Sequence, residues 1–244
     1  MDFQVQGPSK ANADTQDVMI VASRKENVDL REEALKEAGL HVRIVDVEAY
    51  ALENTLGLLN NSAPKDIGET LLTLSKSQGR NDTRTAVVDI GSAITTLYVF
   101  RGDRIIFTRE QSFGGDQLTL AIADTYGLPK ERAELAKRSG ELSEDYRSTL
   151  LQPFKQSVAE QIGQALQFFF ASSQYNSVDR IILIGGGSMI AGLDKTVSEL
   201  LEIPTTSGNP FEDMGNSARV NRRSLMRDAP LFAIACGLAL RSFD

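Results

Sequence analysis

The sequence contains little of what disulfide frameworks and histidine-rich metal centres need. Its 244 residues include one cysteine, Cys236, and one histidine, His41. A single cysteine cannot form an intramolecular disulfide, and a single histidine cannot supply a histidine-rich metal cluster. Cys236 lies in an apolar, helix-like run, where a thiol behaves as a small buried hydrophobe. We therefore expect neither residue to carry the chemistry of the protein.

Basic residues are also scarce, and long apolar runs are missing. The chain has 26 Lys and Arg against 33 Asp and Glu, a formal net charge of −7. This balance argues against a general nucleic-acid binder, which needs a basic surface. The apolar runs fall well short of the roughly 18–20 residues that span a bilayer, and no signal peptide is visible. These absences favour a cytoplasmic protein with enough length for a real core.

Residues 86–100, AVVDIGSAITTLYVF, have the pattern of a β-hairpin with an acidic residue at its turn. β-branched and aromatic residues predict the two strands, and Gly91 marks the reversal. The short hydroxyl side chains that follow are Ser92, Thr95 and Thr96. These hydroxyls and the bare N–H groups of the turn can donate to an anion, and Asp89 fits beside it if a divalent cation lies between them. The hypothesis is a metal–phosphate hairpin, and the alternative is an ordinary hairpin with an aspartate in its turn.

A second glycine-rich turn lies within residues 180–193, RIILIGGGSMIAGL. A short apolar run predicts a buried strand, followed by a tight turn and a helix. The turn consists of Gly185, Gly186, Gly187 and Ser188. It is not a Walker loop, because no Gly-Lys-Ser/Thr follows, and Ile190 stands where the dinucleotide fingerprint needs its third glycine. The remaining interpretation is a nucleotide cradle in which bare backbone lies against a base, ribose or phosphate.

A third turn of this kind precedes a predicted helix at residues 117–126. It consists of Gly114, Gly115 and Asp116. Glycines at a helix N-terminus let a phosphate approach the backbone. This third turn therefore supports the first two.

The other elements follow from local patterns. Strands are predicted at residues 18–22 and 41–45, and helices at residues 24–38, 46–59 and 146–174. Gly39 is expected to end the first of these helices in the left-handed conformation. The loop-like clusters in residues 60–84 are the best candidate for a lobe boundary.

The C-terminal part carries a basic cluster and a final helix. Residues 219–227 contain Arg219, Arg222, Arg223 and Arg227, which form either an anion or partner contact or a solvated loop. Asp228 is expected to cap a last helix that runs through Leu240.

The motifs resemble those of a known superfamily. VVDIGSAITTLYVF is similar to the second phosphate motif of the actin–Hsp70–sugar-kinase superfamily, and IILIGGGSMIAGL to its adenosine motif. FTREQSFGGDQLT, QFFFASSQYNSVDRIILIGGGS, NPFEDM and DAPLFAIACGLALRSFD resemble the PilM family of actin-like type IV pilus assembly proteins, as do DFQVQGPS, ASRKENVD and VDVEAYALE. The resemblance covers nearly the whole chain.

The resemblance implies an α/β architecture, the actin-like ATPase fold, built on a ribonuclease H-like lobe with a mixed sheet and flanking helices. Members of the superfamily carry one Asp-x-Gly hairpin in each of two lobes, but this sequence shows one hairpin and no inserted subdomain. We therefore expect an incomplete first lobe. Residues 1–80 would be its remnant, including the interlobe helix, and residues 81–244 the second lobe.

The resemblance also implies a ligand, ATP or ADP with Mg²⁺. Asp89 would hold the Mg²⁺, through water, and the three turns would lie around the nucleotide. Helix 146–174 would pass the adenosine, so that Lys155 or Glu160 reaches the ribose or base, with a solvated face as the alternative for both. Asp46 or Glu48 would lie near the phosphates, or would only complement a helix dipole. Because half of the phosphate clamp is absent and an open groove is less preorganised, we expect this chain to bind nucleotide less stably than the full-length family does.

The implied function is a cytoplasmic scaffold of the pilus assembly platform, peripheral to the inner membrane through its protein partners. The implied partners are the cytoplasmic tail of PilN, the pilus motor ATPase, PilC and further copies of the chain, with no nucleic acid. The groove for the PilN tail lies largely in the first lobe and would be incomplete. Weak or absent ATPase activity is expected. The alternative is a small-molecule kinase or other ATP-hydrolysing enzyme of the same superfamily.

Overall fold

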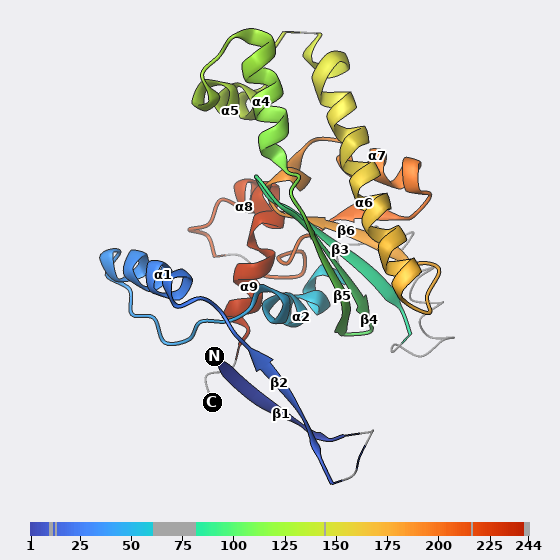
Figure 1. The fold of residues 1–244 in the computed structure, drawn as a ribbon. Helices are drawn as coiled ribbons and strands as arrows, with labels where there is room; N and C mark the ends of the chain where they lie inside the picture. Colours follow the sequence, from blue (N-terminus) through green and yellow to red (C-terminus); the bar gives the residue numbers. More distant parts are fainter. Residues whose placement is uncertain (10–11, 13, 61–81, 144, 216, 242–244) are drawn as a thin grey trace. The chain divides into compact units, whose positions relative to one another are not determined.

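The computed structural model describes residues 1–244 except 10–11, 13, 61–81, 144, 216 and 242–244 (Figure 1). The chain forms two compact units, Met1–Val47 and Glu48–Asp244. The lobe boundary predicted at residue 80 lies outside the described residues and stays a prediction. The helix expected in the first part belongs to the second unit, because its apolar face packs into that unit's core.

The first unit consists of a hairpin and one helix. Strands β1 (Asp2–Pro8) and β2 (Gln16–Val21) pair antiparallel, and α1 (Lys25–Glu37) follows. Gly39 has φ 76°, which confirms the predicted left-handed stop. The strand predicted at residues 41–45 is wrong, because this segment has no regular structure. A strand needs a neighbour for its backbone groups, and the part of the chain described here pairs none with it.

The second unit contains a five-stranded mixed sheet of order β5-β4-β3-β6-β7. Its strands are β3 (Arg84–Ile90), β4 (Thr95–Arg101), β5 (Arg104–Gln111), β6 (Arg180–Ile184) and β7 (Thr205–Ser207). β3 pairs antiparallel with β4 and parallel with β6, and β7 extends the parallel part. The predicted hairpin is therefore confirmed, and β3 lies at the centre of the sheet.

Helices cover both faces of this sheet (Figure 1). They are α2 (Glu48–Leu59), α4 (Gly115–Tyr126), α5 (Lys130–Ser139), α6 (Gln152–Ser172), α7 (Leu193–Leu201), α8 (Arg222–Asp228) and α9 (Ala233–Ala239). A π-helical turn, Arg147–Leu151, precedes α6, so the long predicted helix is confirmed with an irregular first turn. Asp228 ends α8 and is the N-cap residue of a 3-10 turn, Ala229–Phe232, that leads into α9, so the predicted position of the cap is confirmed. The predicted capping bond is not made, because the Asp228 side chain pairs with Arg227 instead.

The alternation of side chains along β3 divides the core into two layers. Val88 and Ile90 belong to the cluster with α6 and α7, whereas Val87 belongs to the cluster with α2 and α9. Successive residues of a strand point to opposite faces, so Asp89 lies on the same face as Val87, toward α2. The polar end of β3 is therefore presented to the first turn of α2.

The contact between α2 and α9 is unusually close. A Cβ atom at Gly237 would lie 1.7 Å from the carbonyl oxygen of Ala51. The buried Thr55 hydroxyl donates to the carbonyl of Ala233 at 2.8 Å, which joins the two helices. The small residues of the predicted final helix are thus explained by packing against α2, and Cys236 between them is half-buried.

Candidate functional site

A groove of about 1590 Å³ lies at the carboxyl ends of β3, β6 and β7 in the second unit. The candidate residues that line it are Gly91, Ser92, Gly115, Asp116, Gly186, Gly187 and Ser188. All three predicted turns therefore contribute to one cavity. In open α/β sheets, ligands bind in the crevice outside the carboxyl ends of the strands.

The hairpin turn is fastened to the start of α4. The amides of Gly115 and Asp116 donate to the carbonyls of Gly91 and Ser92 at 3.0 and 2.8 Å. A Cβ atom at Gly114 would lie 2.4 Å from the carbonyl oxygen of Ser92. The first amides of α4 therefore bond the hairpin turn. Residue 114 must be a glycine because the hairpin backbone lies too close for a side chain.

Close packing against the hairpin also explains two of the three glycines after β6. Gly185 has φ 81°, and a Cβ atom there would lie 2.1 Å from Oδ1 of Asp89. A Cβ atom at Gly187 would lie 2.2 Å from Cγ2 of Ile90. At Gly186, in contrast, the contact would be an ordinary 3.5 Å to Cδ2 of Leu231, which lines the groove. Gly186 is thus the glycine of this turn that the packing of the protein does not require.

Asp89 lies beside the groove wall, between β6 and the first turn of α2. Burial, and then the negative charge of Glu48, raise the pKa of its carboxyl from 3.8 to about 6. Within the described residues, no hydrogen bond to this carboxylate is found. The same surroundings, burial first and then Glu48 and Asp89, raise the pKa of Tyr98 to about 12. The end of β3 therefore carries an excess of negative charge that the neighbouring side chains leave uncompensated.

This arrangement fits a Mg²⁺ ion. Mg²⁺ usually keeps several waters and takes one or two protein carboxylates together with substrate phosphates. No group of three or more acidic, histidine or cysteine side chains is gathered into a metal cluster in the ranges that the structure describes. Asp89, with Glu48 nearby, offers the sparse carboxylate set that Mg²⁺ accepts.

A hydrogen-bonded network on α4 and α5 forms another part of the wall. Nζ of Lys137 lies 2.7 Å from the hydroxyl of Thr119, 2.6 Å from Oε2 of Glu134 and 3.2 Å from the carbonyl oxygen of Gly115. Thr119 is fully buried and also bonds Glu134 at 2.6 Å. Burial raises the pKa of the Glu134 carboxyl, but hydrogen bonds from Lys137, Thr119 and Arg138 together hold it below its usual range. Glu134 therefore faces the groove as a fixed carboxylate.

Sequence reasoning missed this network. Glu134 and Lys137 both line the groove, yet the only sequence signal is an i,i+3 pair of opposite charges, which is common on any exposed helix. Asp116 also gains a partner that was not predicted, Lys130 at 2.7 Å. These two lysines attach α5 to the first turns of α4.

The structure places the other candidates outside the groove lining. They are Asp89, Thr95, Thr96, Gly114, Gly185, Lys155 and Glu160. The buried Thr95 hydroxyl donates to the carbonyl of Phe113 at 2.8 Å, and Glu160 is exposed on α6. The buried Lys155 ammonium lies 3.3 Å from the position of a Cβ atom at Gly192, which itself lines the groove. Lys155 is thus adjacent to the groove wall at Gly192 without lining the groove.

None of the helices in the described ranges is both long and apolar enough to cross a membrane.

Comparison with known proteins gives consistent matches. The family model for type IV pilus assembly protein PilM matches residues 1–243. The chain is similar to a solved structure of a PilM–PilN type IV pilus biogenesis complex, with 28% identity and a TM-score of 0.75, over 98% of this chain and 65% of that chain. It shares its fold with MreB5 of Spiroplasma citri bound to ADP, with 14% identity and a TM-score of 0.55, over 90% of this chain and 65% of that chain.

A curated relative is the anhydro-N-acetylmuramic acid kinase of Francisella tularensis subsp. novicida (strain U112). It is 25% identical over 162 residues, which cover 55% of this chain and 42% of the kinase. The chain thus spans less than two thirds of the length of these relatives. The family match extends over almost every residue, and the mixed sheet with its covering helices agrees with the solved structures. The chain therefore belongs to the PilM family of type IV pilus assembly proteins and has the actin-like ATPase fold.

Proposed function

We propose that the chain is a nucleotide-binding, actin-like scaffold of type IV pilus assembly. The observation that carries this proposal is the groove in which three glycine-rich turns meet at the carboxyl ends of β3 and β6. Its volume of about 1590 Å³ exceeds that of a typical small-molecule site. A groove of this size accommodates a nucleotide with room for solvent.

The chain's own groups indicate where the phosphates would lie. The Ser92 amide, in the turn next to Asp89, has no hydrogen-bond partner in the part of the chain that the structure describes. A bound Mg²⁺ would supply positive charge there for the phosphates. On the adjoining wall, Lys137 reaches the carbonyl of Gly115, and Lys137 and Arg138 balance the charge of Glu134. The ligand would therefore lie with its phosphates toward Ser92.

Calorimetric titration with Mg-ADP and Mg-ATP tests this proposal. Gly186→Ala should weaken binding at least tenfold, because the new methyl enters the groove while its contact with Leu231 remains ordinary. The matched control is Gly57→Ala in α2, where a Cβ atom meets nothing within 4 Å. The proposal fails if the unmodified chain binds neither nucleotide, or if both variants bind as tightly as it does.

The scaffold role concerns partners of the chain. We propose that the chain contacts the cytoplasmic tail of PilN and, through the platform, the motor ATPase and PilC, and that it is held at the cytoplasmic side of the inner membrane by these contacts. The similarity to a PilM chain from a PilM–PilN complex supports the first of these partners. Fluorescence anisotropy with a labelled PilN tail peptide measures this contact separately from nucleotide binding. Absence of binding would remove PilN from this chain's partners without affecting the groove.

The similarity to a sugar kinase favours a second candidate, phosphoryl transfer to a small hydroxyl compound. The two functions make opposite predictions for turnover. A scaffold should release phosphate slowly and at a rate that added sugars do not change, whereas a kinase should release ADP when the sugar is added and transfer the phosphoryl group to the sugar hydroxyl without releasing free phosphate. Assay of phosphate and ADP release with anhydro-N-acetylmuramic acid decides between them.

A further inference from the structure

Helices α4 and α6, both labelled in Figure 1, border a second cavity of about 220 Å³ in the second unit. We call it the α4–α6 pocket. Its floor is apolar and consists of Leu118 and Ala121 of α4, Leu150 of the π-helical turn and Phe154 of α6. Among the described residues, Leu118 is the one that also lines the nucleotide groove. The other residues of the pocket take no part in the groove, so the pocket is a separate site.

The pocket lies where the helical hydrogen bonding is interrupted. A continuous α-helix would need the N–H of residue 153 to bond the carbonyl of Thr149, but Pro153 has no N–H. The preceding turn has the π register, in which the Gln152 amide donates to the carbonyl of Arg147. Thr149 and Pro153 both line the pocket. Because π-helical turns are rare and occur frequently at functional sites, this position favours a binding role for the pocket.

Polar side chains at the rim of the pocket offer unused hydrogen bonds. Gln117 is exposed and Ser157 is half-buried, and within the ranges that the structure describes neither side chain has a hydrogen-bond partner. Thr149 differs from them, because its hydroxyl donates to the carbonyl of Asp145 at 2.8 Å. The rim therefore keeps one amide and one hydroxyl available for a bound group.

The volume and the lining of the pocket suit a bicyclic aromatic ring with one hydrogen-bonding group. An apolar cavity of about 150 Å³ holds benzene, so a cavity of about 220 Å³ has room for the larger indole ring. Phe154 supplies an aromatic wall, which is held by stacking on Phe113 with the ring centroids 5.7 Å apart. Aromatic rings contact each other favourably in offset or edge-on arrangements. The amide oxygen of Gln117 can accept a hydrogen bond from the indole N–H.

We propose that the α4–α6 pocket binds the side chain of a tryptophan that belongs to a partner protein. A free metabolite is a weaker match, because small-molecule sites have about 300–1,000 Å³ and bury most of their ligand. Gln117, Thr149 and Pro153 are exposed at the mouth, which leaves room for the backbone of a partner. Tryptophan is enriched among the residues that anchor interfaces in pockets. Residues 1–244 contain no tryptophan, so a second copy of the chain cannot supply it.

Nuclear magnetic resonance of the full chain with isotope-labelled leucine methyl groups tests this proposal. The probe is a short peptide of glycine and serine residues with a central tryptophan, and the reference peptide has alanine at its centre. The tryptophan peptide should shift the methyl signals of Leu118 and Leu150, with a Kd of about 1 mM for a ring of about ten non-hydrogen atoms. The alanine peptide should leave both signals unchanged.

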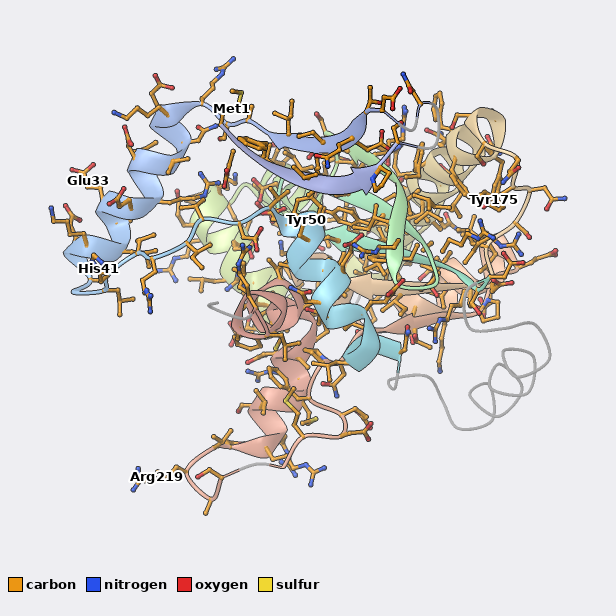
Figure 2. All side chains as sticks on the ribbon, turned by 90° about the horizontal axis from the view of Figure 1, so that it is seen from below. Met1, Glu33, His41, Tyr50, Tyr175 and Arg219 are labelled. Carbon is orange, nitrogen blue, oxygen red and sulfur yellow. The ribbon has the colours of Figure 1, made fainter. Side chains whose placement is uncertain are left out.

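Variants of the pocket make the test specific. Ala121→Leu fills the floor of the pocket and should weaken binding of the tryptophan peptide at least tenfold. The matched control is Ala171→Leu, at an exposed position near the other end of α6 and close in sequence to Tyr175, which is labelled in Figure 2. This control should bind like the unmodified chain. Gln117→Ala shortens an exposed side chain without affecting the core, and loss of its hydrogen bond should weaken binding about threefold to tenfold.

Several results would overturn the proposal. They are signals that the tryptophan peptide does not shift, equal shifts with the alanine peptide, and binding that neither Ala121→Leu nor Gln117→Ala weakens. A further one is a shift with free indole but not with the tryptophan peptide, which would make the pocket a site for a free small molecule. None of these measurements uses nucleotide, so their outcome is independent of whether the groove binds Mg-ADP or Mg-ATP.

Discussion

Replacement of Asp89 by asparagine should stabilise the ligand-free protein at neutral pH. Asp89 is largely buried between Thr96 of β4 and Ile184 of β6, and burial, followed by the charge of Glu48, raises the pKa of its carboxyl to about 6. The ionised carboxylate is therefore disfavoured in the folded chain relative to the unfolded one. Asparagine has nearly the same shape and carries no charge, so it removes this penalty.

The size and sign of the effect follow from proton linkage. The pKa of Asp89 rises from 3.8 to about 6, and one pKa unit corresponds to about 1.4 kcal/mol. Because the folded state holds its proton more tightly, its stability is highest when Asp89 is protonated and falls as the pH rises from about 4 to about 6. Above that window the loss is complete and amounts to about 3 kcal/mol. The asparagine variant should exceed the unmodified chain by this amount at pH 8 and by less than about 1 kcal/mol at pH 4.

Urea denaturation followed by far-ultraviolet circular dichroism at pH 4 and pH 8 measures this difference. The control is Glu48→Gln, which should stabilise the chain at pH 8 by a smaller amount, because the charge of Glu48 contributes less to the shift than burial does. An asparagine variant that is less stable than the unmodified chain at pH 8 would refute the reasoning. So would a gain that is equal at both pH values, since it would not arise from titration of Asp89.

Further predictions concern the groove and the core. Thr119→Val should reduce the free energy of unfolding by about 1–3 kcal/mol, because the buried hydroxyl that joins Lys137 to Glu134 is lost, and chemical denaturation measures this. Gly237→Ala should destabilise the contact between α2 and α9 by about 1–3 kcal/mol or more, since its methyl would overlap a backbone carbonyl, whereas Gly57→Ala should not destabilise. Phe100→Ala should lower the free energy of unfolding by about 3–5 kcal/mol, because Phe100 is completely buried. A loss under about 1 kcal/mol at Phe100 would contradict its place in the core.

Much of the second unit could be predicted from local patterns. The hairpin at Asp89 and the strand before Gly185 are rich in apolar and β-branched residues, and this composition agrees with their buried positions. The apolar stripe of α6 and the stop at Gly39 likewise required no information from distant parts of the chain. In these segments, propensity, pattern and tertiary position agree.

The failures occurred where distant contacts decide the outcome. Residues 41–45 have strand composition but no neighbouring strand, and Asp228 has the chemistry of a cap but binds Arg227. Glu134 and Lys137 become a groove wall only because α5 packs on the start of α4, which no local pattern shows.

The glycines illustrate why a candidate site needs the structure. Five glycines in two turns suggested a backbone that lies bare against a ligand, but a side chain at Gly114, Gly185 or Gly187 would overlap the hairpin or its flanking strand. These three are required for the turns to pack together whether or not a nucleotide binds. At Gly115 and Gly186 a Cβ atom would make ordinary contacts and would lie on the groove wall. Substitutions at these two positions therefore report on the ligand, whereas substitutions at the other three report first on the fold.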